Sequence, residues 1–201
     1  MRIIKLEDLE IEYVARILNE GGLIVYPTET VYGLGADATS EAALEKLWAF
    51  KGERGDKPVL VAVADLAMAE KYVNLTNLGR KIAQKYWPGP VAIVASSKNE
   101  VAKKAQGQTE TLGLRNPDNK VMLEVIRTLG KPITSTSANI SGGLTARSLS
   151  EFLATMPEDR QKLIDLFIDA GELPKNLPST IVDTTEEKIK ILRQGGTEVL
   201  V

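Results

Sequence analysis

Hydrophobic residues recur at helical spacing in several stretches of the chain. Residues 9–18 carry such a stripe, and two consecutive glycines follow as a typical helix terminator. Residues 121–129 carry a second stripe, which a single glycine closes. Ser40 is a suitable N-cap for another helix, which we expect to end near Gly52. The remaining helices are expected at residues 65–72, 75–86, 148–155 and 157–163.

Short apolar runs between these helices predict β-strands. We expect strands at residues 23–26, 59–63, 91–95, 111–115, up to 134, 166–170, 179–183, 188–193 and 198–201. The strands alternate with helices in the first part of the chain and cluster toward its end. This order predicts an α/β fold whose sheet has mixed strand direction rather than a purely parallel one.

Length and composition place the chain among soluble globular proteins. Its 201 residues suit one domain, or one domain with a C-terminal extension, and the hydrophobic fraction of 43% is typical. No apolar run approaches the ~18 residues that a membrane span requires. The amino terminus becomes acidic before a signal-peptide core could form. We therefore expect a cytoplasmic protein without a membrane partner.

The chain contains neither cysteine nor histidine, and this narrows its chemistry. Disulfides and thiolate catalysis are excluded, and the commonest general base and the usual zinc and iron ligands are absent. A metal would have to be a hard ion such as Mg²⁺, held by oxygen atoms. The formal net charge of −2 counts against a dedicated nucleic-acid binder.

Two segments rich in hydroxyl groups and glycine directly follow predicted strands. Residues 27–35 read Pro-Thr-Glu-Thr-Val-Tyr-Gly-Leu-Gly, and residues 135–143 read Ser-Thr-Ser-Ala-Asn-Ile-Ser-Gly-Gly. The first is equally compatible with a ligand site and with a loop whose hydroxyls bond their own backbone. The second favours a phosphate-facing cluster of N–H and hydroxyl groups. Neither segment is a Walker loop or a dinucleotide fingerprint, and a serine hydrolase would need a neighbouring base.

Several cations accompany these segments. Residues 51–58 form a basic loop, which by itself is more typical of an exposed surface. Arg115 stands at the end of a predicted, otherwise uncharged strand, where α/β proteins gather ligand groups. Its guanidinium suits a carboxylate or phosphate. With Arg193 near the carboxyl terminus, these cations indicate a site for an anionic small molecule.

In order and spacing these segments resemble the YrdC family, in particular its short, single-domain threonylcarbamoyl-AMP synthases (TsaC type). The matching residues cover nearly the whole chain and lie at 27–35, 51–58, 87–90, 113–117, 135–142, 178–183 and 191–193. The resemblance implies one catalytic domain over residues 1–201 with no additional C-terminal domain. It also implies a twisted mixed sheet with flanking helices and a large concave, positively lined cavity.

The resemblance further implies a reaction and a set of site residues. ATP, L-threonine and bicarbonate or CO₂ would condense to threonylcarbamoyl-AMP and pyrophosphate, with Mg²⁺ accompanying ATP and no protein side chain assigned to the metal. The product serves the threonylcarbamoyladenosine modification of tRNA through downstream transfer proteins. Thr30, Arg115 and Ser135 would hold threonine. The nucleotide would contact Lys51, Lys57, Thr111, Ser137, Asn139, Thr145, Ser179 and Arg193. The catalytic role would fall to Lys51, Arg54, Ser137 and Asn139.

The chain departs from the family pattern in its basic loop, and two other functions remain open. The family commonly has Lys-x-Arg here, whereas Glu53 takes the arginine's place and Arg54 comes one residue late. Either Arg54 serves after a shift of the loop, or the role has moved elsewhere. One alternative function is a non-catalytic module that binds structured RNA (tRNA or double-stranded RNA) in the same basic cavity. Another is transfer of a carbamoyl group from an adenylate to a different acceptor.

Overall fold

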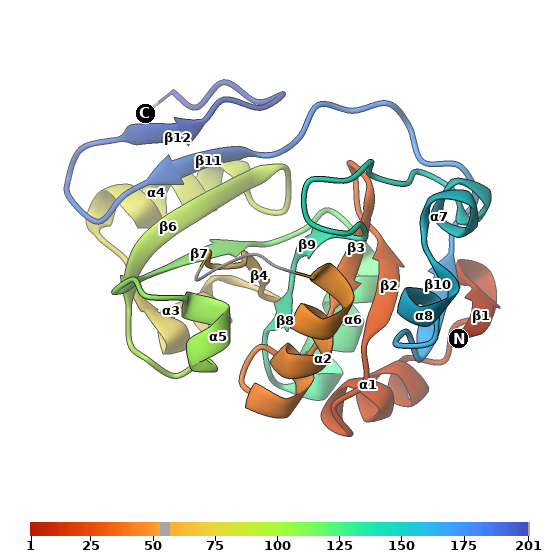
Figure 1. Ribbon diagram of the computed structural model, residues 1–201. Helices are drawn as coiled ribbons and strands as arrows, with labels where there is room; N and C mark the ends of the chain where they lie inside the picture. The colour runs from red at the N-terminus through yellow and green to blue at the C-terminus, as the bar shows by residue number, and fades with distance from the viewer. Residues whose placement is uncertain (53–56, 201) are drawn as a thin grey trace.

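Two mixed β-sheets organise the chain in the computed structural model, which describes residues 1–52 and 57–200 (Figure 1). The first sheet has the order β1-β10-β2-β3-β9. These strands span Arg2–Lys5 (β1), Leu166–Asp169 (β10), Ile24–Pro27 (β2), Tyr32–Gly35 (β3) and Thr136–Ser137 (β9). The strands β1, β10 and β2 run parallel, whereas β3 is antiparallel to both β2 and β9.

The second sheet has the order β12-β11-β6-β7-β4-β8, with β5 paired to β6 outside this path. Its strands span Lys190–Arg193 (β12), Thr180–Asp183 (β11), Val91–Ser97 (β6), Thr111–Arg115 (β7), Val61–Ala62 (β4), Ile133–Thr134 (β8) and Val73–Asn74 (β5). The pairs β11–β6 and β4–β7 are parallel, and the other pairs are antiparallel. The predicted α/β class with mixed strand direction is confirmed, but the strands are divided between two sheets rather than one.

Helices flank both sheets. They span Leu6–Asp8 (η1, a 3-10 turn), Ile11–Asn19 (α1), Glu41–Lys51 (α2), Leu66–Tyr72 (α3), Asn77–Tyr86 (α4), Lys103–Gln106 (α5), Lys120–Leu129 (α6), Leu149–Thr155 (α7) and Glu158–Gln161 (α8). In Figure 1, α7 and α8 lie beside the first sheet and α4 beside the second, while α1 packs against α6. Within the described residues, no helix is long and apolar enough to cross a membrane.

Local sequence sets the helix ends. The Ser40 side chain accepts a hydrogen bond from the backbone N–H of Ala43, as predicted for the start of α2. Asn119 caps α6 in the same way. Gly130 closes α6 with a left-handed backbone (φ 72°), a conformation that glycine adopts without steric cost.

The apolar residues form one buried core that lies against both sheets. Its largest members are aromatic: the ring centroids of Phe152 and Phe167 are 5.3 Å apart, and those of Tyr32 and Phe167 are 4.9 Å apart. Tyr26 on β2 and Phe50 on α2 are likewise fully buried. This core fixes the first sheet to its helices, so the loops at the strand ends rest on a packed support.

Several predicted boundaries are wrong in an informative way. The strand expected at 59–63 shrinks to Val61–Ala62, and residues 198–200 form no strand within the described chain. Tyr32–Gly35, expected as part of a loop, is strand β3. Its two glycines carry little strand propensity, and pairing with β2 supplies the hydrogen bonds that define it. The short strands β1, β5 and β9 were not predicted, since they too are defined by their partners.

Candidate functional site

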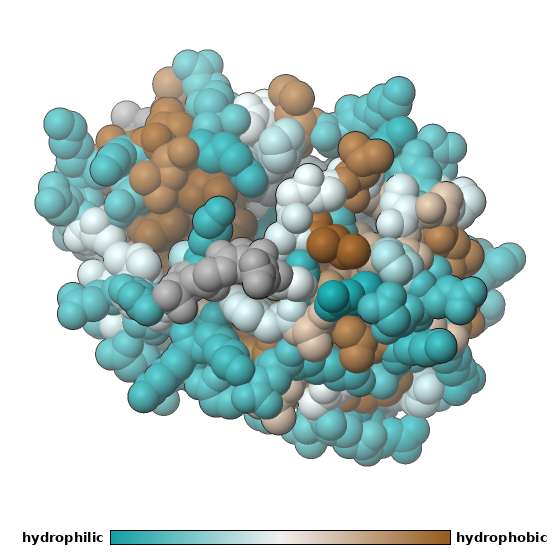
Figure 2. Space-filling view, viewed as in Figure 1, coloured by the Kyte–Doolittle hydropathy of each residue, from teal (hydrophilic) through white to brown (hydrophobic). Residues whose placement is uncertain are grey.

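A cavity of about 480 Å³ opens where the two sheets meet, and Figure 2 shows this face of the molecule hollowed between its two halves. Its wall consists of Thr28, Thr30, Val31, Gly33, Pro58, Val59, Leu60, Arg115, Ser135, Thr136, Ser137, Thr145, Asn176, Pro178, Ser179, Ile181 and Arg193. Ser135 has a special position in this wall, because it is the one residue between β8 of the second sheet and β9 of the first. The chain therefore crosses from one sheet to the other at the cavity.

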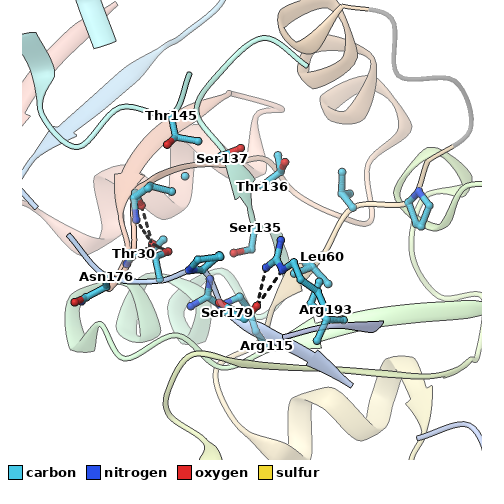
Figure 3. A pocket seen from close by; sticks show the side chains of 17 residues that line it. Thr30, Leu60, Arg115, Ser135, Thr136, Ser137, Thr145, Asn176, Ser179 and Arg193 are labelled. Carbon is cyan, nitrogen blue, oxygen red and sulfur yellow. Dashed lines mark hydrogen bonds between the residues drawn. The ribbon is translucent and has the colours of Figure 1, made fainter. Parts of the chain in front are cut away.

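The first hydroxyl-rich segment is the tip of the β2–β3 hairpin. The Thr28 hydroxyl donates to the carbonyl of Val31 at 2.6 Å and accepts from the backbone N–H groups of Thr30 and Val31 at 3.2 and 3.3 Å. The Thr28 side chain therefore satisfies its own loop, as one of the two sequence interpretations held. Thr30 lies on the cavity wall, where Figure 3 shows its side chain beside those of Asn176 and Ser135.

The second segment is organised around Asn139 and Lys51. The Asn139 carboxamide oxygen accepts from the Ser137 hydroxyl at 2.6 Å and from Lys51 Nζ at 3.0 Å, while its Nδ2 donates to the carbonyl of Gly143. Lys51 Nζ also donates to the carbonyl of Ser137 at 2.8 Å. The backbone N–H of Ser141 in turn donates to the carbonyl of Lys51. This network ties residues 137–143 to the end of α2.

Lys51 reaches this network from the last turn of α2. The residue as a whole is only 3% exposed. A cation is favourable at a helix C-terminus, where backbone carbonyls point outward. Neither Lys51 nor Asn139 forms part of the cavity wall, although both contact Ser137, which does. The structure thus places them one layer behind the surface that a ligand would touch.

Arg115 supplies a buried positive charge at the end of β7. Its side chain is 6% exposed and forms an ion pair with Glu29 of the β2–β3 hairpin, whose side chain is 16% exposed. Burial lowers the pKa of the Arg115 guanidinium from its usual value; nearby Tyr26 opposes this shift, and nearby Arg193 adds to it. Arginine remains charged despite such a shift, so the cavity holds a cation suited to a carboxylate.

Arg193 brings a second guanidinium to the cavity from β12. Its Nε and Nη2 both donate to the carbonyl of Ser179, at 3.1 and 2.9 Å (Figure 3). Burial also lowers the pKa of Arg193. The pair of bonds fixes the guanidinium beside β11, where Ser179 lies on the same wall.

Seven of the predicted site residues line this cavity: Thr30, Arg115, Ser135, Ser137, Thr145, Ser179 and Arg193. Lys57 is exposed and does not line the cavity, although the next residue, Pro58, lines it. Arg54 lies outside the described residues. Thr111 does not reach the wall: it begins strand β7 and Arg115 ends it, so the strand separates them by about 13 Å.

Glu29 and Asn176 contribute to the site although their sequence context predicted no role for either. Asn176 lies in the connection at residues 171–178, where its Nδ2 donates to the backbone carbonyl of Glu29 at 2.7 Å. Glu29 stood inside a recognised motif, and its acidity beside so many hydroxyls was the available signal. Asn176 gave no signal, because only the folded chain brings residues 29 and 176 together.

The described residues of the cavity wall offer no cluster of acidic side chains. No aspartate or glutamate occurs among the described residues that line it. The described chain also contains no group of three or more acidic residues placed to share an ion. Hydroxyl and amide oxygens alone are weak ligands for Mg²⁺, which prefers carboxylates and phosphates.

Comparison with known proteins places this geometry in a family. The family model described as "Telomere recombination" (Sua5/YciO/YrdC) matches residues 16–195. A protein of Vibrio vulnificus named threonylcarbamoyl-AMP synthase is 32% identical over 188 residues, which cover 92% of this chain and 98% of the relative. A protein of the same name from Pyrococcus abyssi is 33% identical over 193 residues, 96% of this chain; the match spans about half (56%) of that longer relative.

Solved structures agree with this placement. The crystal structure of P. abyssi Sua5 complexed with L-threonine superimposes with a TM-score of 0.89 at 32% identity, covering 98% of this chain and 58% of that one. The E. coli YciO structure gives a TM-score of 0.80 at 26% identity, covering 94% of this chain and 90% of that one. This chain belongs to the Sua5/YciO/YrdC family.

Proposed function

We propose that this protein is a threonylcarbamoyl-AMP synthase, which condenses L-threonine, bicarbonate or CO₂, and ATP to threonylcarbamoyl-AMP and pyrophosphate. One observation carries the proposal: two arginines from different strands converge with serine and threonine hydroxyls on one cavity without histidine or cysteine. Such a wall suits an amino-acid carboxylate and a phosphate together. The similarity to the Vibrio relative over nearly its whole length supports the same activity.

The β2–β3 hairpin and the end of β7 form the amino-acid side of the site. Arg115 supplies the positive charge that a threonine carboxylate requires, and Thr30 and Ser135 supply hydroxyl donors beside it. Arginine and hydroxyl groups held by a sheet recognise such a group with little further ordering. We assign threonine to this side of the cavity.

The second hydroxyl-rich segment and β12 form the nucleotide side. Ser137, Thr145, Ser179 and Arg193 line this part of the wall, and Lys51 with Asn139 holds Ser137 from behind. Donors fixed in advance stabilise the charge that develops on phosphate oxygens during displacement. Lys51 therefore contributes by ordering the segment that meets the nucleotide.

The chemistry requires two bond-forming steps. The neutral threonine amine attacks the carbon of CO₂ and releases a proton to give a carbamate; with bicarbonate, a C–O bond breaks and water leaves. A carbamate oxygen then attacks the α-phosphorus of ATP, and the bond to the β-phosphate oxygen breaks to release pyrophosphate. The carbamate is already an anionic nucleophile, so this second step needs positioning and charge stabilisation rather than a base.

Mg²⁺ would accompany ATP in this scheme. Because the described residues of the wall include no carboxylate, we expect phosphate oxygens of the nucleotide to supply most of the ligands of the ion. We assign no side chain to the metal. Transfer of the threonylcarbamoyl group to tRNA would fall to separate downstream proteins.

Incubation of the purified protein with ATP, L-threonine and bicarbonate tests the proposal. We expect threonylcarbamoyl-AMP by mass spectrometry, with pyrophosphate in equal amount and dependent on all three substrates. Neither product should form in reactions from which threonine or bicarbonate is omitted. Salt-sensitive binding of tRNA without any turnover would instead favour the RNA-binding alternative, which the net charge of −2 already disfavours.

A further inference from the structure

Arg115 is held by an acidic residue that no substrate role requires. Glu29 pairs with Arg115 Nη2 through its Oε1, and both side chains are largely buried. Glu29 is not part of the cavity wall. Arg115 is, and so is Thr30, the residue that follows Glu29 in the chain. The carboxylate therefore contacts the guanidinium from outside the space that a ligand would fill.

Two further atoms of this pair point to a specific geometry. Arg115 Nε and Glu29 Oε2 are both buried without a hydrogen-bond partner. Nε and Nη2 form one edge of the guanidinium, and a carboxylate matches that edge with two parallel hydrogen bonds. Of these two hydrogen bonds the structure holds only the one from Nη2 to Oε1, so Glu29 engages neither Nε nor Nη1.

Charge balance gives Glu29 a second task. Arg193 is close enough to lower the pKa of Arg115, and both guanidinium groups line the same cavity. Two like charges this close repel each other, and the repulsion favours other conformations of the two side chains. Glu29 supplies a resident negative charge that keeps Arg115 in place before a substrate arrives.

The backbone of Glu29 is also fixed. Its carbonyl accepts a hydrogen bond from Asn176, and its neighbours Thr28 and Thr30 belong to the hydrogen-bonded turn of the hairpin. The carboxylate accordingly projects from a rigid turn rather than from a free loop. A rigid partner on one edge is what a buried arginine needs to present the other groups in a constant direction.

We propose that Glu29 is a positioning residue that orients Arg115 toward the carboxylate of the amino-acid substrate and so sets the specificity for a free carboxylate. The proposal rests on the proposed function, because it needs threonine as the ligand of Arg115. Glu29 itself touches no reacting atom in this scheme. Its effect reaches the substrate through the guanidinium alone.

The test compares Glu29→Gln with the wild type on two substrates, L-threonine and L-threoninamide, which lacks the carboxylate charge. Glu29→Gln keeps the size of the side chain and removes its charge. We expect the KM for threonine to rise about tenfold, the loss typical of one charge-assisted hydrogen bond, while the KM for ATP stays within about twofold. The preference for threonine over threoninamide should fall by a similar factor.

Controls separate positioning from general damage. Glu70→Gln breaks an exposed ion pair with Arg80. It should leave the threonine KM and the preference for threonine over threoninamide unchanged. In an Arg115→Ala background, Glu29→Gln should cause no further rise in the threonine KM. Glu29→Asp, which retains the charge on a shorter chain, should restore part of the threonine preference and serves if Glu29→Gln fails to fold.

The outcomes distinguish this proposal from the function on which it rests. A wild-type protein that makes no product from threonine would overturn the proposed function. An active wild type with an unchanged threonine KM in Glu29→Gln would overturn only the positioning role. A lower threonine KM in Glu29→Gln would also overturn it, because Glu29 would then compete with the substrate for Arg115.

Discussion

The two hydroxyl-rich segments border the same cavity but are held in place by different means. Residues 27–35 form a hairpin in which β2 and β3 pair directly, and the turn is closed by the hydroxyl of its own Thr28. Residues 135–143 include only the short strand β9, and they depend on Lys51 from a helix more than eighty positions away in the chain. The turn of the first segment is thus closed by one of its own side chains, whereas the second segment adds a contact from Lys51 to its internal hydrogen bonds.

This difference coincides with the two sides of the proposed site, the amino-acid side and the nucleotide side. The hairpin carries the groups assigned to threonine. The segment assigned to the nucleotide also depends on Lys51, so a single substitution outside the cavity wall should disturb it. Substitutions in and behind the two segments test that contrast.

Lys51→Met should cause the largest loss. The substitution keeps an unbranched chain but removes the donor to the Ser137 carbonyl and the Asn139 side chain. We expect turnover to fall on the order of 100-fold, as when a fixed donor is lost from an active site. Steady-state assays at saturating ATP and threonine measure this. Lys104→Met, which breaks an exposed ion pair with Glu45, is the matched control and should retain wild-type turnover.

The same variant should also lose stability. Buried acceptors left without their donor cost about 1–3 kcal/mol, so the urea midpoint of Lys51→Met should fall below that of Lys104→Met. Wild-type turnover in a folded Lys51→Met protein would show that the second segment keeps its shape unaided, and the contrast between the segments would be lost.

Thr30→Val should have a smaller and more selective effect. It removes a hydroxyl from the cavity wall while the hairpin and its Thr28 hydrogen bonds to the backbone remain. We expect the threonine KM to rise about fivefold to tenfold with little change in the ATP KM, since one hydrogen bond contributes about 1 kcal/mol. Thr155→Val, at an exposed hydroxyl on α7, is the control. A rise in the ATP KM instead would reverse the assignment of the two ends.

Alkaline pH should produce the smallest effect, through the Tyr32 hydroxyl of the hairpin. The Tyr32 hydroxyl accepts from the backbone N–H of Ala170 and donates to the carbonyl of Gly171, which anchors the start of residues 171–178. Burial raises the pKa of Tyr32 to about 12; the hydrogen bond from Ala170 lowers it, and Asp169 raises it.

The sign of this dependence follows from the raised pKa. Because the folded pKa exceeds the unfolded value of about 10, the neutral hydroxyl stabilises the fold fully below pH 10. This contribution should be lost as the pH rises from about 10 to about 12. Urea unfolding across that range measures it, and Tyr32→Phe should flatten the decline. An equal slope in Tyr32→Phe would assign the decline to other groups.

The helices and strands were predictable where the local sequence preference agrees with the tertiary structure. The helix α6 matches its predicted range to within one residue, and strand β7 matches at both ends. Strand β3 was missed because two of its four residues are glycine, and no local preference marks it. The division into two sheets was missed for a related reason: strand pairing is a property of partners that are distant in sequence.

The candidate site shows the same division. Residues that project directly from motifs, such as Thr30, Ser135 and Arg115, were predicted from sequence and line the cavity. Thr111 was predicted with them and lies at the other end of its strand, because a motif match does not measure the length of a strand. Asn176 was missed, since it enters the site through a connection without a recognisable pattern.

The sequence by itself determined the chemical character of this protein. A chain with hydroxyls, arginines and lysines at strand ends and no histidine or cysteine is suited to binding anions, and the order of residues along the chain indicates this. Only the tertiary structure decided how the charges are arranged. Glu29 meets Arg115 across 86 positions and Lys51 meets Ser137 across a similar separation, so sheet packing, not local preference, selects each partner.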